Sequence, residues 1–142
     1  MEPVKPKLST NRVIFACIHN AGRSQIAAAF FNLLTDQNKA LAISAGTNPA
    51  PQLHPEVMDA MKEVGIDLTG IRPRLLTREL AAQSTLLITM GCGEACPIIP
   101  GLRREDWKIP DPKGQPPVRI REIRDGLLQL VKNLIKRENW SR

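Results

Sequence analysis

A cysteine followed six positions later by an arginine frames the part of this sequence best suited to chemistry. The segment reads Cys17-Ile18-His19-Asn20-Ala21-Gly22-Arg23-Ser24. An apolar run of strand type precedes it, and an alanine-rich stretch that favours a helix follows at once. In such a strand–loop–helix turn, backbone N–H groups can converge at the helix N-terminus and bind an anion. We therefore expect residues 17–24 to hold a tetrahedral oxyanion.

The polar residues of this loop have distinct expected roles. Cys17 is the expected nucleophile, because the field of the loop favours its thiolate at neutral pH. Arg23 offers a planar fork of donors to two oxygens of the anion, and Ser24 can donate a hydrogen bond to the thiolate. Gly22 permits a tight backbone path, and Asn20 can bridge loop amides and hold the shape.

Asp111, in an Asp-Pro pair, is a further candidate for chemistry. An acid beside the anion can donate a proton to a leaving oxygen, whereas the alternative is an ordinary turn aspartate. Its expected place on the same edge of the sheet as Cys17 and Arg23 favours the acid. We expect His19, by contrast, to be a loop side chain that faces solvent.

Two more cysteines, Cys92 and Cys96, lie four residues apart. On an ideal helix their Cβ atoms would be about 5–6 Å apart, and a disulfide needs roughly 4 Å. The pair can therefore close only where the backbone is irregular, as the neighbouring Gly91, Gly93 and Pro97 allow. No second pair stands at a matching spacing, so we predict no metal site. A core role for one of the two thiols stays an alternative.

Composition limits the classes of function. A chain of 142 residues with 42% hydrophobic residues suits one domain with one core. No apolar run approaches the ~20 residues that span a bilayer. The N-terminus lacks a signal-peptide pattern, so we expect a cytoplasmic protein without membrane contact. The net charge of +6 is scattered and aromatic residues make up 4%. Small anions are therefore expected partners, and nucleic acid is not.

Strand and helix patterns alternate along the chain. We expect residues 1–11 to form a flexible arm and residues 12–142 to form one domain. Short apolar runs predict strands at residues 13–16, 41–45, 85–90 and 107–109. Helical spacing predicts helices at residues 24–34, 55–64, 77–82 and 120–135. The second helix is expected to bury Val57, Met58, Met61 and Val64. Residues 91–106 carry glycine and proline and are expected to form a long loop.

This alternation predicts an α/β fold, a single-domain four-stranded parallel sheet with helices on both faces. Ligands of such sheets bind where the carboxyl ends of the strands meet. Cys17, Cys92 and Asp111 follow the first, third and fourth predicted strands. Three residues capable of chemistry thus fall on one edge, which core packing alone does not require.

Together these segments resemble the arsenate reductases built on the low-molecular-weight protein tyrosine phosphatase fold. The resemblance rests on residues 17–25 and Ala27, on Ser44-Ala45-Gly46-Thr47, His54-Pro55, Val64-Gly65-Ile66-Asp67, Ile88-Thr89-Met90-Gly91-Cys92, Glu105-Asp106-Trp107 and Asp111-Pro112. It extends from about Val13 to Leu134. It implies the flavodoxin-like strand order 2-1-3-4.

The resemblance also implies a reaction and its partners. Cys17 would attack arsenate held by Arg23 and the loop amides, and Asp111 would assist departure of the oxygen. Cys92 would then attack Cys17 and release arsenite, and Cys96 would resolve the intermediate as a Cys92–Cys96 disulfide that thioredoxin reduces. Phosphate and sulfate would act as analogues of arsenate. No bound cofactor is expected.

The reductant stays open at this point. Thioredoxin-coupled members generally separate the last two cysteines more widely than Cys92 and Cys96. The closer spacing also resembles actinobacterial members in which mycothiol and a mycoredoxin serve, and glutathione with a glutaredoxin is the related option. Members with a potassium site carry a glutamate where Ala28 stands, so we expect no potassium site.

Other functions compete with arsenate reduction for arsenic detoxification. A low-molecular-weight protein tyrosine phosphatase would use the same Cys17, Arg23 and Asp111. Phosphatases of this fold usually place aromatic residues after the Asp-Pro pair, where Lys113-Gly114-Gln115 stands here. A phosphate carrier would not need the two later cysteines. A thiol sensor of arsenite would not need residues 17–24, which we call the anion loop. Arsenate reduction is therefore the function that the sequence favours.

Overall fold

The computed structural model describes residues 10–91, 96 and 98–142. Helices and strands alternate within these residues, as the sequence pattern predicts. The elements are β1 (Asn11–Cys17), α1 (Arg23–Leu34), β2 (Ala40–Gly46), α2 (Pro55–Lys62), α3 (Arg78–Ala82), β3 (Leu86–Thr89), β4 (Arg103–Asp106) and α4 (Pro117–Arg137).

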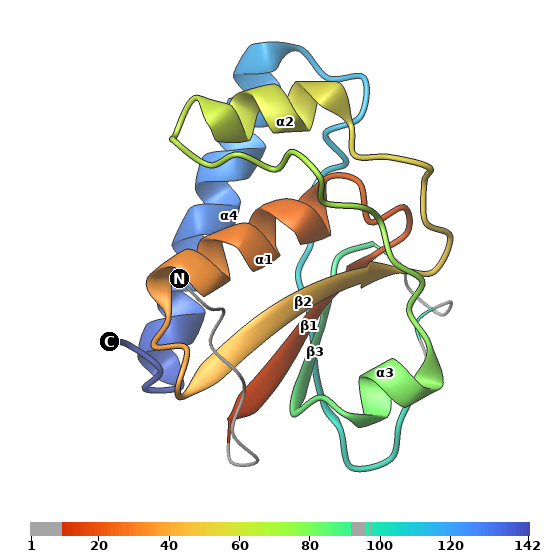
Figure 1. Cartoon of the computed structure of the whole chain (residues 1–142), viewed down its shortest axis with the longest axis vertical. Helices are drawn as coiled ribbons and strands as arrows, with labels where there is room; N and C mark the ends of the chain where they lie inside the picture. The colour runs from red at the N-terminus through yellow and green to blue at the C-terminus, as the bar shows by residue number, and fades with distance from the viewer. Residues whose placement is uncertain (1–9, 92–95, 97) are drawn as a thin grey trace.

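The strands form one parallel four-stranded sheet in the order β2-β1-β3-β4, which confirms the expected topology (Figure 1). β1 lies at the centre, where Ala16 is the register partner of Ala45 in β2 and of Thr89 in β3. All carboxyl ends therefore meet at one edge of the sheet. Cys17 is the last residue of β1 and lies at that edge.

From Val13 to Cys17 the central strand β1 is buried on both faces, which explains the unbroken apolar run of these residues. Side chains alternate along a strand, so Val13, Phe15 and Cys17 join one hydrophobic cluster while Ile14 and Ala16 join another. Helices α1, α2 and α4 cover the first face, and α3 lies on the opposite face (Figure 1). Helices on both faces were expected, and the structure confirms them.

Helix α4 has the amphipathic pattern that its sequence predicts. Its buried apolar residues are Ile120, Ile123, Leu127, Val131, Leu134 and Ile135. After the helix, Trp140 packs on Phe31 of α1 with ring centroids 5.9 Å apart. No helix in the described part of the chain combines the length and apolarity needed to cross a membrane.

The fourth strand lies elsewhere than the apolar pattern predicts. β4 occupies Arg103–Asp106, within the segment expected to be a loop, and residues 107–109 form no strand. An edge strand needs partners on one side alone, and β4 carries charged residues that stay partly exposed, so no apolar run marks it. Trp107 instead packs on Phe15, with ring centroids 5.6 Å apart.

Two smaller expectations also need correction. Asn11, assigned to the flexible arm, begins β1, because its N–H donates to the carbonyl of Lys39 at 2.9 Å. Val64 is 45% exposed and does not join the buried face of α2. The helix ends at Lys62, before Val64, and Gly65 follows in the left-handed region at φ 82°.

Candidate active site

Cys17 lies buried at the junction of β1 and α1. Its thiol is free and 2% exposed, and its Sγ lies 2.9 Å from the Oγ of Ser24. Asn20 Nδ2 donates to the same Oγ at 2.7 Å, so this oxygen already accepts one hydrogen bond. The hydroxyl proton of Ser24 is then available to the sulfur. This geometry suits stabilisation of a thiolate.

The backbone carbonyl groups of the loop after Cys17 accept hydrogen bonds from a neighbouring segment. Residues of the 47–54 segment donate backbone N–H groups to the carbonyls of Cys17, Ile18, His19 and Ala21 at 2.8–3.2 Å. Within the described residues, the amides of residues 18–22 donate to no protein acceptor. Since the carbonyls are engaged elsewhere and the amides are not, the loop has the donor arrangement of an anion-binding nest.

Asn20 fixes the shape of this loop. It adopts the left-handed region at φ 52° and is fully buried. Its Oδ1 accepts from Gln25 Nε2 at 3.1 Å and from the backbone N–H of Arg74 at 2.8 Å. Gln25 Nε2 also donates to the Asn20 carbonyl at 2.9 Å. These roles of Gln25 and Arg74 are not predicted from the sequence. A polar glutamine among the apolar residues of the helix is the one signal that could have indicated the role of Gln25.

Glycines bring other segments close to the loop. A Cβ on Gly46 would lie 2.6 Å from the carbonyl oxygen of Ile18, and a Cβ on Gly22 would lie 2.9 Å from Cγ of Pro112. Gly22 has φ −141°, so its visible requirement is space rather than left-handed backbone. The segment that carries Asp111 therefore packs directly on the anion loop.

Arg23, the first residue of α1, lies between the loop and the segment after β4. It is 8% exposed, and its Nη1 donates to the carbonyl of Ile109 at 3.0 Å. Its Nη2 lies 3.9 Å from Oδ2 of Asp111, whose side chain is 45% exposed. Asp111 Oδ1 also accepts from the N–H of Lys113 at 3.0 Å. Asp111 therefore closes a turn and also faces Arg23.

Two histidines flank the loop. His54 donates its N–H to the carbonyl of Ala21 at 3.0 Å and is half-buried. Burial lowers the pKa of His54 below its usual 6.5, against the opposing charges of Glu56 and Asp111. In the sequence, His54 is singled out only within the His54-Pro55 segment of the family resemblance, and its place at the loop is not predicted. His19, expected to face solvent, is half-buried.

The later cysteines differ in what the structure describes. Cys92 lies outside the described residues. Cys96 is 1% exposed and belongs to the cluster of Ile14 and Leu87, on the face opposite the cluster that contains Cys17. No group of three or more His, Cys, Asp or Glu side chains suited to a metal ion occurs among the residues that the structure describes.

Comparison with known proteins assigns the family. Residues 12–140 match the family described as low molecular weight phosphotyrosine protein phosphatase. The chain belongs to this family. The match covers the anion loop, the two later cysteines and Asp111, so the site lies entirely within the family domain.

Several relatives of this phosphatase-family chain bear the name arsenate reductase. A putative arsenate reductase of Halobacterium salinarum is 33% identical over 135 residues, covering 92% of this chain and 95% of the relative. A thioredoxin-dependent arsenate reductase of Corynebacterium glutamicum is 35% identical with TM-score 0.78, covering 89% of this chain and 61% of that chain. An arsenate reductase in a phosphate-binding state is 30% identical with TM-score 0.77, covering 90% and 98% of the two chains.

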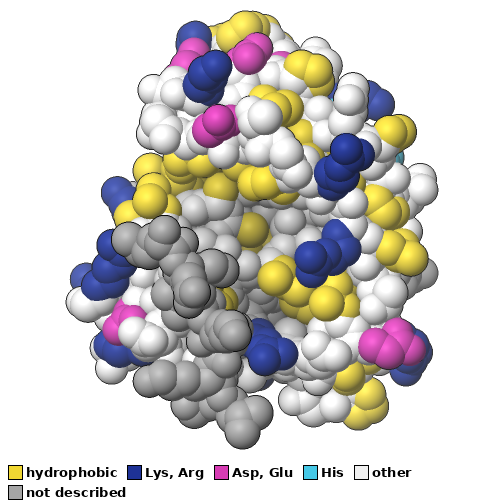
Figure 2. Space-filling view, viewed as in Figure 1, with side chains coloured by type: hydrophobic (Ala, Val, Ile, Leu, Met, Phe, Trp, Pro, Cys, Tyr) yellow, Lys and Arg dark blue, Asp and Glu magenta, His cyan; other side chains and the backbone are white. Residues whose placement is uncertain are grey.

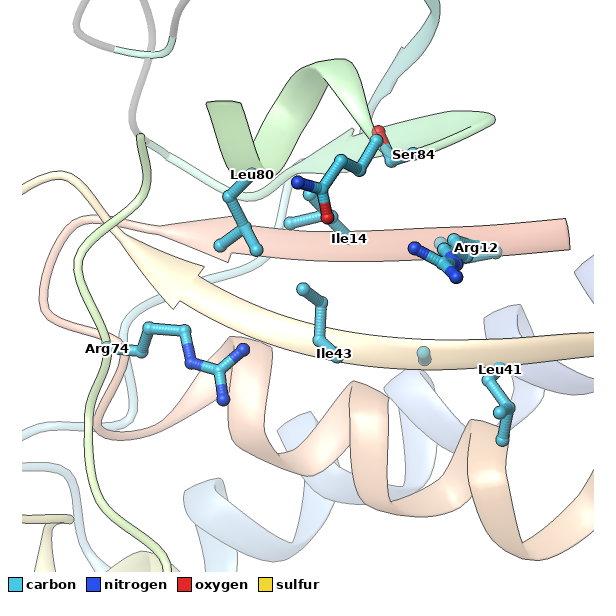
Figure 3. A pocket seen from close by; sticks show the side chains of 10 residues that line it. Arg12, Ile14, Leu41, Ile43, Arg74, Leu80 and Ser84 are labelled. Carbon is cyan, nitrogen blue, oxygen red and sulfur yellow. The ribbon is translucent and has the colours of Figure 1, made fainter. Parts of the chain in front are cut away.

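Two surface pockets of this family member differ in whether they adjoin the anion loop. One, of about 470 Å³, is lined by Thr89, Gly91 and residues 106–110, and so adjoins Arg23 through Gly91 and Ile109. The other, of about 360 Å³, lies between β1, β2 and α3, with Arg12 and Arg74 at its two ends (Figure 3). None of its lining residues belongs to the anion loop, and we assign it no chemistry.

The charge of the surface gives no sign of an extended polyanion site on the face seen in Figure 2. Lysine and arginine side chains are spread over this face, with acidic side chains among them (Figure 2). This distribution agrees with the scattered charge of the sequence.

Proposed function

We propose that this chain reduces arsenate to arsenite, with Cys17 as nucleophile and Cys92 and Cys96 as a thiol relay that thioredoxin regenerates. The observation that carries the proposal is the buried Cys17 thiol in an anion loop, in a chain that also places two cysteines after the neighbouring strand. The nearly full-length similarity to proteins named arsenate reductase supports it.

In the first step the Cys17 thiolate attacks arsenic(V), and a sulfur–arsenic bond forms. Arg23 and the amides of residues 18–22 hold the remaining oxygens and balance their charge. Asp111 donates a proton to the departing oxygen, which leaves as water. Arsenic keeps its oxidation state in this step, because a hydroxyl ligand is exchanged for a thiolate.

The second step transfers two electrons. The Cys92 thiolate attacks the sulfur of Cys17, the sulfur–arsenic bond breaks, and its electron pair stays on arsenic, which leaves as arsenite. Cys17 and Cys92 are then joined by a disulfide. Cys96 attacks the sulfur of Cys92, releases the Cys17 thiolate and closes the Cys92–Cys96 disulfide, which the dithiol of thioredoxin reduces by exchange.

The strand pairing supports the meeting of Cys92 with Cys17. Met90, two residues before Cys92, donates its N–H to the carbonyl of Ala16 at 2.7 Å. Ala16 directly precedes Cys17, so the backbone that leads to Cys92 starts beside the nucleophile. Cys96 is 1% exposed, so its sulfur is shielded from a bulky reductant.

A small thiol is the alternative reductant. Mycothiol or glutathione would attack the sulfur-bound arsenic adduct on Cys17, and a mycoredoxin or glutaredoxin would complete the cycle. The same Arg23 and Asp111 would serve. The two routes differ in whether Cys92 is needed for turnover.

Phosphatase activity is the second candidate function. The family description itself names phosphotyrosine, and the Asp111 carboxyl lies 3.9 Å from the guanidinium of Arg23, the group that would hold a phosphate ester. Asp111 would then protonate the leaving oxygen. Water would then hydrolyse a phosphocysteine at Cys17. Arsenate and phosphate have similar shape and charge, so low phosphatase activity is compatible with the main proposal.

The test follows NADPH oxidation with arsenate, thioredoxin and thioredoxin reductase. We expect arsenate-dependent turnover by the wild type and at least a hundredfold loss in Cys92→Ser and in Cys17→Ser, since each removes a group that forms a covalent bond. p-Nitrophenyl phosphate hydrolysis, measured in parallel, should be lost in Cys17→Ser and kept in Cys92→Ser.

The opposite results separate the alternatives. Full activity of Cys92→Ser, or turnover only with mycothiol or glutathione and its redoxin, would contradict the intramolecular relay. Arsenate reduction by Cys17→Ser under any reductant would contradict the whole assignment. Phosphate-ester hydrolysis without any arsenate reduction would favour the phosphatase.

A further inference from the structure

The backbone of Gly91 lies directly against the guanidinium of Arg23. Gly91 has φ +90°, a left-handed conformation that favours glycine. A Cβ at this position would lie 2.6 Å from Nη1 and 3.3 Å from both Cζ and Nη2 of Arg23. All three atoms belong to the guanidinium. The missing side chain of Gly91 therefore leaves the space that the guanidinium occupies.

The other side of the guanidinium is also defined. Nη1, the atom closest to the added Cβ, donates to the carbonyl of Ile109 at 3.0 Å, and Nη2 faces Asp111 at 3.9 Å. Arg23 is 8% exposed, so this packing and these polar contacts set the plane of its fork. Bidentate binding of a tetrahedral anion depends on that plane.

We propose that Gly91 is a positioning residue for the oxyanion, acting through the orientation of Arg23. The inference rests on the part of the proposed function in which Arg23 binds the anion, and it holds for arsenate and phosphate alike. A side chain at residue 91 would displace the guanidinium from the Ile109 carbonyl and turn its donors away from the loop. The requirement for glycine here is thus a requirement of binding as well as of backbone conformation.

The effect of Gly91→Ala on anion binding can be distinguished from its effect on folding. The atoms that an added Cβ would meet are the far end of a flexible side chain, so the fold can accommodate alanine by moving Arg23. The strain of alanine in a left-handed conformation remains. Gly101 provides a matched control, because it has φ +82° and an added Cβ there meets none of the described atoms within 4 Å.

The experiment titrates inorganic phosphate into the reduced full-length chain by calorimetry. Displacing a charged donor predicts a rise of about tenfold in the Kd of Gly91→Ala, and a change below about twofold in Gly101→Ala. The two variants should lose a similar amount of thermal stability. Equal phosphate affinity in the two variants would overturn the proposal, as would a Tm of Gly91→Ala far below that of Gly101→Ala.

A double-mutant cycle adds a readout that a purely structural role would not change. Lysine lacks the planar fork, so in an Arg23→Lys background the Gly91→Ala change should weaken phosphate binding by less than about twofold. An equal loss in both backgrounds would contradict action through Arg23. Phosphate binding does not depend on electron transfer, so failure of arsenate turnover alone would count against the proposed function and not against this role of Gly91.

Discussion

The sulfur of Cys17 and the hydroxyl oxygen of Ser24 lie 2.9 Å apart, both buried where β1 passes into α1. Asn20 donates to that oxygen at 2.7 Å and so leaves its proton for the sulfur. A single polar chain, from Gln25 through Asn20 and Ser24 to Cys17, therefore joins the left-handed residue of the loop to the nucleophile. We therefore expect the reactivity of Cys17 to depend on the residues of this chain.

Replacing Ser24 by alanine should slow the reaction of Cys17 with electrophiles. A hydrogen bond to a charged sulfur is worth about 1.5–3 kcal/mol, so we expect alkylation by iodoacetamide near neutral pH to fall at least about tenfold. Mass spectrometry of the peptide that contains Cys17 measures this rate. Ser84→Ala, which removes a hydroxyl bonded to the Ala81 carbonyl away from the loop, is the control and should react like the wild type.

Replacing Asn20 by alanine should destabilise the fold as well as the site. The change removes the acceptor of the Arg74 amide and one of the two acceptors of Gln25 Nε2, and it puts alanine in a left-handed conformation. Together these losses predict a destabilisation of about 2–4 kcal/mol. Urea unfolding measures it. Asn139 also has positive φ, at 61°, but is exposed, so Asn139→Ala should cost only about 1 kcal/mol. Equal losses would show that the hydrogen bonds of Asn20 contribute little.

Asp111→Asn should slow the step in which oxygen leaves. An amide cannot donate the proton as an acid, so we expect a fall of about a hundredfold in single-turnover arsenite formation, with phosphate affinity nearly unchanged. Asp59→Asn, which changes an exposed carboxylate on α2, should have no effect. A normal rate in Asp111→Asn would contradict the role of Asp111 as an acid. Asp111 would then act only as a turn residue, through the hydrogen bond that it accepts from the N–H of Lys113.

Glu63 links α2 to α4 and makes stability depend on acid pH. Its carboxylate accepts from Arg121 and Arg124, which lowers the pKa of Glu63 from 4.5 to about 2. A carboxyl with a depressed folded pKa stabilises the fold above about pH 4.5, and this contribution is lost as pH falls towards 2. Glu63→Gln should therefore lower the Tm near pH 6 and match the wild type near pH 2. Thermal melts across this range test it, with Glu79→Gln as an exposed control.

The sequence predicts the core of this fold well where burial is two-sided. Residues 13–17 of β1 and 86–88 of β3 form unbroken apolar runs because helices or loops cover both faces, and the place of Cys17 at the edge follows from the first run. β4 could not be found in the same way. Its residues Arg103–Asp106 are all charged and pair with β3 at the edge of the sheet, so no apolar run marks the strand.

Some residues of the site can likewise be predicted from the sequence, and others cannot. Cys17, Arg23 and Ser24 follow from residue type and spacing, since the chemistry needs those side chains. Gln25 and Gly91 act on the loop through a bond to Asn20 and a contact with Arg23. The roles of Gln25 and Gly91 depend on how separate segments pack in space, and the spacing of residues along the chain does not show this packing.

The most direct test of the central claim is a single turnover without any reductant. Reduced wild-type chain mixed with excess arsenate should form one arsenite per chain, and its mass should fall by two hydrogen atoms as a disulfide closes. Cys17→Ser and Cys92→Ser should form no arsenite by this route. Absence of arsenite from the wild type, or arsenite formed without loss of thiols, would contradict the account.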